Sequence, residues 1–180
     1  MATSDQILSV FKQFCEEYKT HFYQIDEGVF TMNVWSSNAR LEVRCYVGDT
    51  YLLFSSLLPV PLPPEKQHAV MEFITLANFG RIIGSFEMDL KNGIVAFKTD
   101  ITVIDAQLTT KTLYVLLGEN ICTADHYLKG IYQITHANMQ PSVAIRKLER
   151  SETGNAEADE ELRELLNDPA IDEALGKIDD

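Results

Sequence analysis

Residues 76–97 read Leu-Ala-Asn-Phe-Gly-Arg-Ile-Ile-Gly-Ser-Phe-Glu-Met-Asp-Leu-Lys-Asn-Gly-Ile-Val-Ala-Phe, and this stretch decides the fold. An amphipathic helix ends in it near Asn78, and Gly80 follows where a left-handed residue commonly ends a helix. Alternating residues then begin at Phe86, and Asn92-Gly93 marks a hairpin turn. A type I′ turn needs positive φ at both central positions, which favours this pair. The stretch predicts a helix joined directly to a β-hairpin.

Upstream of this stretch the apolar residues change their period. Over residues 4–19 they recur at three- and four-residue steps, which predicts a helix. Three alternating segments follow and predict strands. Four prolines end the last of them, because proline cannot donate to a sheet ladder, and the helix that contains Phe73 comes next. The alternating segments are residues 30–34, 41–47 and 50–58.

Downstream, a return strand over residues 94–101 precedes two helical patterns, which Thr123-Ala124-Asp125 separates as a plausible cap. Strands joined by hairpins, with helices at the breaks, favour an α+β fold. We expect an antiparallel sheet of about five strands with helices packed on it, in the order α-β-β-β-α-β-β-α. Residues 1–150 would form this domain.

Residues 151–180 differ in composition and form an acidic tail with 11 acidic and two basic residues. An acidic run is commonly solvated and disordered. The apolar residues of the tail nevertheless recur at helical spacing, so the tail could also dock as an amphipathic helix pair on its own domain or on a partner. The tail-docking candidates are Leu162, Leu165, Leu166, Ile171 and Leu175.

Three places in the chain resemble the YbjN-like family of bacterial sensory-transduction regulators, whose fold is that of the type III secretion chaperones. They are Pro59-Val60-Pro61, the joint from residue 76 to residue 97, and the helix around Asp125-His126-Tyr127 with Pro141 beyond it. The resemblance covers residues 1–146. It implies a small acidic protein, commonly dimeric, that holds other polypeptides, and it brings no catalytic residues with it.

Charge and cysteine content narrow the classes of function. The formal net charge is −12, which repels phosphate backbones and anionic membranes, so neither nucleic acid nor membrane is an expected partner. No apolar stretch reaches the ~20 residues that a membrane helix needs, and the start lacks a signal-peptide pattern. Three widely spaced cysteines indicate thiols in a reducing compartment. We expect a cytoplasmic protein.

Catalytic and metal-binding patterns are missing from the sequence. The four histidines form neither His-x-His nor His-Glu-x-x-His, and no cysteine lies at ligand spacing from them, so we expect no metal and no cofactor. Glu87 and Asp89 share one face of a strand and are the only paired carboxylates that an enzyme could use. A solvated strand face explains them better, and we expect no enzyme.

Several apolar residues do not fit into one core face; such an excess is typical of association surfaces, or else the first helix or the tail covers these residues. Together with the family resemblance, which implies a dimer that holds other polypeptides, an association surface leads us to expect a protein-binding, chaperone-like module. It would act as a homodimer and hold an extended or helical segment of another polypeptide. Alternatives are a small-molecule sensor with a pocket between sheet and helices, and an enzyme of unknown class. The apolar excess comprises Tyr51, Leu53, Phe79, Ile82 and Ile83, and the partner-binding candidates are Tyr51, Leu53, Phe73, Phe79 and Ile83.

Overall fold

The computed structural model describes residues 4–104 and 107–152. The chain divides within its last described helix into two compact units, and the first, Met1–Ile145, contains the whole sheet. No described helix is long and apolar enough to cross a membrane. The expected tail, apart from its first two residues, lies outside the described part, so the domain boundary at residue 150 stays a prediction.

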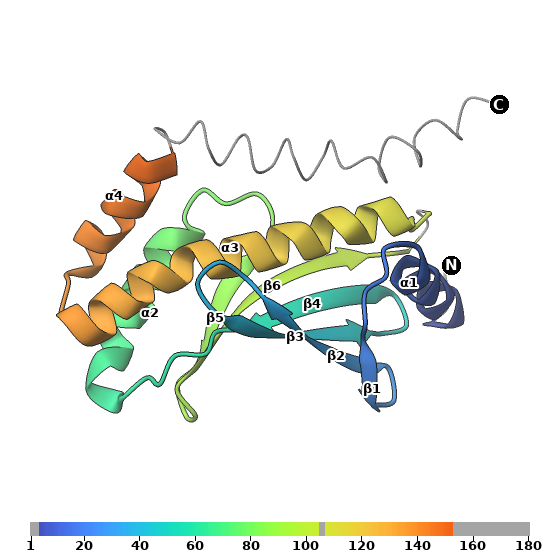
Figure 1. The fold of residues 1–180 in the computed structure, drawn as a ribbon, viewed down its shortest axis with the longest axis horizontal. Coiled ribbons are helices and arrows are strands. Elements are labelled where there is room, and N and C mark those ends of the chain that lie inside the picture. The colour runs from blue at the N-terminus through green and yellow to red at the C-terminus, as the bar shows by residue number, and fades with distance from the viewer. Residues whose placement is uncertain (1–3, 105–106, 153–180) are drawn as a thin grey trace. The chain divides into compact units, whose positions relative to one another are not determined.

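One six-stranded antiparallel sheet forms the centre of the first unit, with strand order β1-β2-β3-β4-β6-β5 (Figure 1). The chain leaves β4, crosses through α2 and returns at the edge as β5. It then turns back as β6, which pairs with β4. The strands are β1 (Tyr23–Asp26), β2 (Val29–Trp35), β3 (Arg40–Val47), β4 (Tyr51–Leu57), β5 (Ser85–Asp89) and β6 (Ile94–Thr102).

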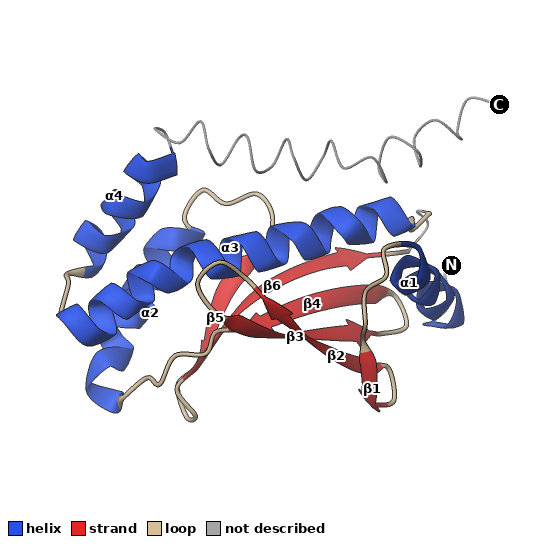
Figure 2. Ribbon diagram, in the orientation of Figure 1, coloured by secondary structure: helices blue, strands red, loops and turns tan. Residues whose placement is uncertain are grey.

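Helices α1, α2 and α3 cover one face of this sheet, and α3 lies across it (Figure 2). Side chains on the covered face are buried, whereas the outer face is half-buried or exposed along much of each strand. The outer face of β4 begins with Tyr51 and Leu53. The helices are α1 (Ser4–Glu17), α2 (Pro64–Asn78), α3 (Thr110–Ala137) and α4 (Pro141–Glu152).

Large apolar side chains fill the space between helices and sheet. α1 contributes residues at its three- and four-residue steps, and α2 contributes Phe73 in the same way. Burying each such side chain stabilises the fold by about 1.5–3 kcal/mol. The largest fully buried side chains include Phe11, Phe14, Phe54, Phe73, Phe97 and Leu128.

Buried polar groups fix α3 to the middle of the sheet. Asn120 is fully buried and donates from Nδ2 to the carbonyl oxygens of Phe54 on β4 (3.2 Å) and Phe97 on β6 (3.0 Å). Its Oδ1 accepts a hydrogen bond from the hydroxyl of Ser56. Thr99 on β6 donates to the carbonyl oxygen of Leu116 at 3.0 Å. These bonds set both the position and the rotation of α3, because a buried polar group without a partner is costly.

The predicted α+β fold with an antiparallel sheet is confirmed, and three details differ. The sheet has six strands instead of about five, and the additional strand is β1, a four-residue segment that is too short for its alternation to predict a strand. The two helical patterns after β6 are the single helix α3, and α4 follows it. The β5–β6 turn has four residues, 90–93, and only Gly93 has positive φ (64°), so it is not type I′.

Candidate functional site

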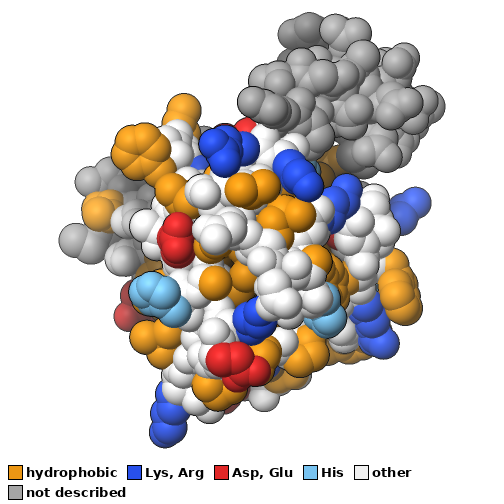
Figure 3. All heavy atoms as spheres, turned by 90° about the vertical axis from the view of Figure 1, so that its left-hand side faces the viewer, with side chains coloured by type: hydrophobic (Ala, Val, Ile, Leu, Met, Phe, Trp, Pro, Cys, Tyr) orange, Lys and Arg blue, Asp and Glu red, His pale blue; other side chains and the backbone are white. Residues whose placement is uncertain are grey.

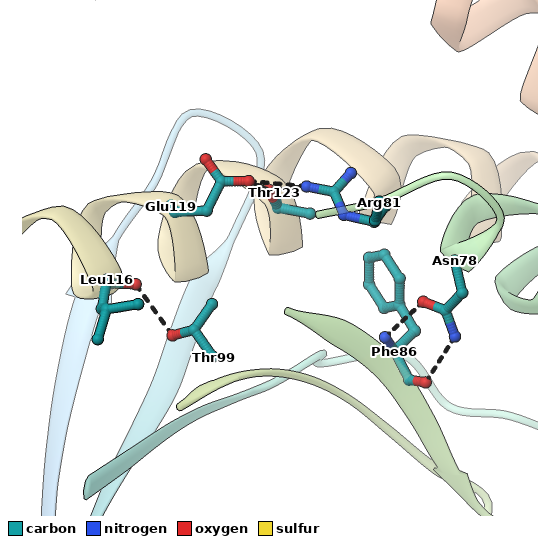
Figure 4. Close-up of polar contacts among 7 residues, drawn as sticks. All are labelled: Asn78, Arg81, Phe86, Thr99, Leu116, Glu119 and Thr123. Carbon is teal, nitrogen blue, oxygen red and sulfur yellow. Dashed lines mark hydrogen bonds and ion pairs between the residues drawn. The ribbon is translucent and has the colours of Figure 1, made fainter. Parts of the chain in front are cut away.

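The loop between α2 and β5, residues 79–84, is the candidate site, and Asn78 fixes its two ends. The Asn78 side chain accepts a hydrogen bond from the backbone N–H of Phe86 (2.7 Å) and donates one to the carbonyl oxygen of Phe86 (2.9 Å; Figure 4). The last residue of α2 is therefore tied to the second residue of β5, which makes the α2–β5 loop a closed turn.

Arg81 fixes the middle of the α2–β5 loop to α3. Its Nη2 donates to Glu119 Oε1 at 2.7 Å and to Thr123 Oγ1 at 2.9 Å, and Thr123 itself donates to Glu119 (Figure 4). The guanidinium carbon lies 5.2 Å from the ring centroid of Phe97 and 5.5 Å from that of Tyr127. Since Arg81 is only 18% exposed, this ion pair is less screened than a surface pair.

Two glycines let the backbone make this turn. Gly80 has φ +83° and Gly84 has φ +72°, the left-handed region that favours glycine. A Cβ on Gly84 would lie 2.5 Å from the carbonyl oxygen of Lys98 and from the ring of Phe97, so a larger residue would push the loop away from β6. Steric fit and hydrogen bonds thus hold the backbone in one conformation.

This fixed backbone presents large apolar side chains to solvent. Phe79 is 91% exposed, Ile82 is 98% exposed, and Ile83 is 41% exposed. Phe79 and Ile82 are the two most exposed large apolar side chains of the described residues. Ordering a loop costs conformational entropy, and here the ordered loop buries neither of them. Exposed aromatic and aliphatic groups on a rigid scaffold are typical of protein-binding surfaces.

The described residues on the face that Figure 3 shows form no single broad apolar patch there. Figure 3 shows the hydrophobic side chains of this face in small groups between charged and polar ones. Leu76, one helical turn before the α2–β5 loop, is 38% exposed, and Glu72 is exposed on the same helix. Phe79 and Ile82 therefore stand out among the described residues by the degree of their exposure.

Tyr51 and Leu53, two of the predicted partner-binding residues, lie apart from this loop on the outer face of the sheet. Tyr51 is 45% exposed, and its ring lies so close to Gly48 that a Cβ there would be 2.2 Å from a ring atom. Leu53 is half-buried and pairs across the strands with Tyr46. These residues form a small apolar area among charged groups such as Asp100, which is opposite Leu53 on β6.

Phe73 is not on the surface in this structure. It is fully buried, and its ring centroid lies 6.1 Å from that of Tyr127 on α3. The i, i+3, i+4 spacing that placed it on an apolar helix face describes the core face of α2. Phe73 is therefore not part of the candidate surface. Of the five predicted residues, Phe79 and Ile83 lie together in the α2–β5 loop, and Tyr51 and Leu53 lie together on the outer face of the sheet.

Glu87 and Asp89, the carboxylates considered for catalysis, have structural partners. Glu87 forms an ion pair with Lys98 on β6 at 2.6 Å. Asp89 accepts hydrogen bonds from Asn92 Nδ2 (2.6 Å) and from the backbone N–H of Lys91 (2.9 Å). The hydrogen bond from the Asn92 side chain is the main reason that the pKa of Asp89 lies below its usual value. Asp89 therefore stabilises the β5–β6 turn.

α3 also holds a second loop, the turn between β2 and β3. Asp125 Oδ1 accepts from Ser36 Oγ (2.6 Å) and from the backbone N–H of Asn38 (2.9 Å), and Oδ2 accepts from Asn38 Nδ2 (2.7 Å). Next to this β2–β3 turn, Trp35 is 79% exposed, and Arg40 lies 5.9 Å from its ring centroid. Thr123 and Asp125, which suggested a cap in the sequence, are thus loop-binding residues inside α3.

The residues that hold the α2–β5 loop were not predicted from the sequence. In the sequence, Asn78 indicates only the end of a helix, and Arg81 is only a cation in a loop. Ile82 belongs to the apolar excess but not to the predicted partner-binding residues. One signal existed: two glycines that bracket Arg-Ile-Ile indicate a short, sharply bent loop. The identity of the acceptors of Arg81 depends on how α3 packs.

Within residues 4–104 and 107–152, no group of three or more His, Cys, Asp or Glu side chains could hold a metal ion. The tail-docking candidates Leu162, Leu165, Leu166, Ile171 and Leu175 lie outside the described residues.

Comparisons with known proteins identify the fold and the family. The crystal structure of YbjN from E. coli aligns with a TM-score of 0.53 and 10% identity, over 67% of this chain and 87% of that chain. The structure of the ExsC–ExsE complex aligns with a TM-score of 0.54 and 15% identity, over 72% and 96%. The fold is therefore that of the type III secretion chaperones.

A search of curated protein sequences gives no match. The family model named YbjN, with the description "Putative bacterial sensory transduction regulator", matches residues 3–132. The expected membership of the YbjN-like family is thereby confirmed over residues 3–132. The chain belongs to the YbjN family.

Proposed function

We propose that this protein is a non-enzymatic, protein-binding regulatory module whose main contact surface is the α2–β5 loop. The observation that carries the proposal is the exposure of Phe79 and Ile82 on a backbone that Asn78 and Arg81 hold in place. The fold relative ExsC occurs in a complex with ExsE, which supports a polypeptide as the partner.

Binding energy at protein interfaces is concentrated in a few buried anchors that are already ordered before contact. A Phe and an Ile side chain, each more than nine-tenths exposed, offer such anchors. Arg81 strengthens this role because its ion pair with Glu119 removes the entropy that an unanchored loop would lose on binding.

The direct test is affinity capture from the native cell with the full chain and with Phe79→Asp and Ile82→Asp variants. A carboxylate at either position should abolish recovery of the specific partner, since an unpaired charge would have to be buried. Leu90→Asp is the matched control, because Leu90 is 54% exposed in the β5–β6 turn. Equal recovery with all three variants would exclude the α2–β5 loop as the contact surface.

The proposal includes a homodimer formed through the outer face of the sheet. Tyr51 and Leu53 support it as apolar groups on a face that none of α1, α2 and α3 covers. Sedimentation velocity should give a dimer for the wild type and a monomer for Leu53→Glu. A wild type that stays monomeric at high concentration would remove the dimer without affecting the α2–β5 loop.

A further inference from the structure

The α2–β5 loop also indicates what kind of partner it fits. We infer that it inserts Phe79 and Ile82 into an apolar pocket on a folded protein, and that it does not hold an extended peptide. This inference rests on the proposed function and specifies the partner class at the same surface. It differs from the expectation that the protein holds an extended or helical segment.

The side chains of Phe79 and Ile82 protrude from the α2–β5 loop. A residue that lines a groove loses part of its exposure to the opposite wall, yet Phe79 is 91% and Ile82 98% exposed. They are convex features, and a convex apolar feature is buried only by a concave surface. An extended peptide could cover only one side of the Phe79 ring and one side of the Ile82 side chain, whereas a preformed pocket encloses a side chain on all sides.

The sheet edge beside the α2–β5 loop is already hydrogen-bonded at Phe86. A peptide that adds to a sheet pairs with free backbone groups along an edge strand. β5 is the edge strand beside the loop, but both the N–H and the carbonyl oxygen of Phe86 are bonded to the Asn78 side chain. Asn78 thus occupies the place of a neighbouring strand, so an extended segment cannot pair with β5 at this residue.

The charges near the α2–β5 loop favour a pocket on a protein over a lipid surface as the binding partner. Arg81 is the only charged residue in the loop, and it is paired with Glu119. The exposed charged residues on the preceding helix are Glu65 and Glu72, both acidic, and the whole chain carries −12. Membrane-binding loops combine apolar groups with unpaired cations for anionic lipid, and this loop has none. The matching pocket is apolar with a neutral or basic rim.

Photo-crosslinking in the native cell tests the inference with the full chain. p-Benzoylphenylalanine replaces Phe79 or Ile82, and as the matched control it replaces Leu90. The crosslinked partner residues are located by mass spectrometry, and hydrogen exchange of the purified partner alone shows whether they are already folded. Titration of that partner with Phe79→Asp and Ile82→Asp then gives affinities, which should fall roughly tenfold or more relative to Leu90→Asp.

Each outcome decides the inference. Adducts from positions 79 and 82, but not 90, in exchange-protected regions of one partner support it. Adducts in a segment that exchanges freely in the isolated partner overturn it and leave the proposed function intact, as do adducts between two copies of this chain. Co-sedimentation with vesicles of phosphatidylcholine and phosphatidylglycerol that Phe79→Asp abolishes also overturns it. Absence of any protein adduct from both positions contradicts the proposed function itself.

Discussion

Asn78 and Phe86 form a two-bond pair in which one side-chain amide binds both backbone groups of one strand residue, at 2.7 and 2.9 Å. The pair joins the end of α2 to the edge strand β5 and closes the α2–β5 loop between them. A single side chain therefore both shapes the candidate binding loop and closes the edge of the sheet beside it.

Replacing Asn78 with Ala should lower the free energy of unfolding by about 1–3 kcal/mol, because both hydrogen bonds to Phe86 are lost. Urea denaturation measures this change. Thr75→Ala on the same helix is the control, since the Thr75 hydroxyl bonds only to the Met71 carbonyl oxygen of its own helix. A loss no greater than that of the control would mean that the pair contributes nothing to stability.

Asn120 should be a larger contributor to stability, since it is fully buried and bonds both β4 and β6. Asn120→Leu should cost about 2–4 kcal/mol, in part because the Ser56 hydroxyl loses its acceptor. Adding Ser56→Ala to that variant should recover about 1 kcal/mol, which a double-mutant cycle resolves. Strict additivity of the two substitutions would show that the buried pair is not coupled.

Substitution of Phe79 should leave the free energy of unfolding almost unchanged, whereas substitution of Phe73 should lower it strongly. Both are phenylalanines and lie within seven residues of each other in the chain. Phe79→Ser and Ile82→Ser should change the free energy of unfolding by no more than about 0.5 kcal/mol, because both side chains are exposed. Phe73→Ala should cost about 3–5 kcal/mol through the cavity that it leaves. A large loss for Phe79→Ser in thermal melts would mean that the loop residue is packed in solution.

Asp125 should hold the β2–β3 turn, and Trp35 reports on that turn because it is the only tryptophan. Asp125→Ala removes the acceptor of Ser36 and Asn38, so the turn should loosen and the fluorescence anisotropy of Trp35 should fall. The emission maximum should change little, since Trp35 is already 79% exposed. The exposed Asp100→Ala is the control, and an equal anisotropy in both variants would rule out the restraint.

The thiols should react in an order set by burial. Burial raises the pKa of Cys45 well above its ordinary value and also raises that of Cys15, whereas Cys122 is exposed. Because the thiolate is the reactive form, a disulfide reagent at pH 8 should modify Cys122 first and Cys45 only after unfolding. The fast phase should disappear in Cys122→Ser, and its persistence would contradict this order.

The raised pKa of Cys45 also has a consequence for stability. The folded state binds the thiol proton more tightly than the unfolded state does, so this contribution is complete below the ordinary thiol pKa. It is lost as pH rises through that value toward the folded pKa. Urea midpoints should therefore fall in the alkaline range, and a midpoint that rises between pH 8 and 10 would have the wrong sign.

Much of the fold could be predicted because its signals are local. The 3.6- and 2-residue periods of α1, α2 and the longer strands mark which side chains face the core, and Gly80 marks where α2 ends. β1 escaped prediction because its four residues are too few to establish a period, although Tyr23 and Ile25 alternate with Gln24 and Asp26. The division of α3 was wrong because Thr123 and Asp125 suit a helix cap as well as they suit their actual partners, Arg81 and Asn38.

By itself, the sequence determined the α+β class, the family resemblance and the joint from helix to hairpin at residues 76–97. Only the tertiary structure decided which apolar residues are exposed. Phe73 and Phe79 carry the same side chain, and their burial depends on whether α3 covers them. The bonds of Arg81 to Glu119 and of Asn78 to Phe86 join residues that only packing brings together, and these bonds turn an apolar loop into a fixed, exposed surface.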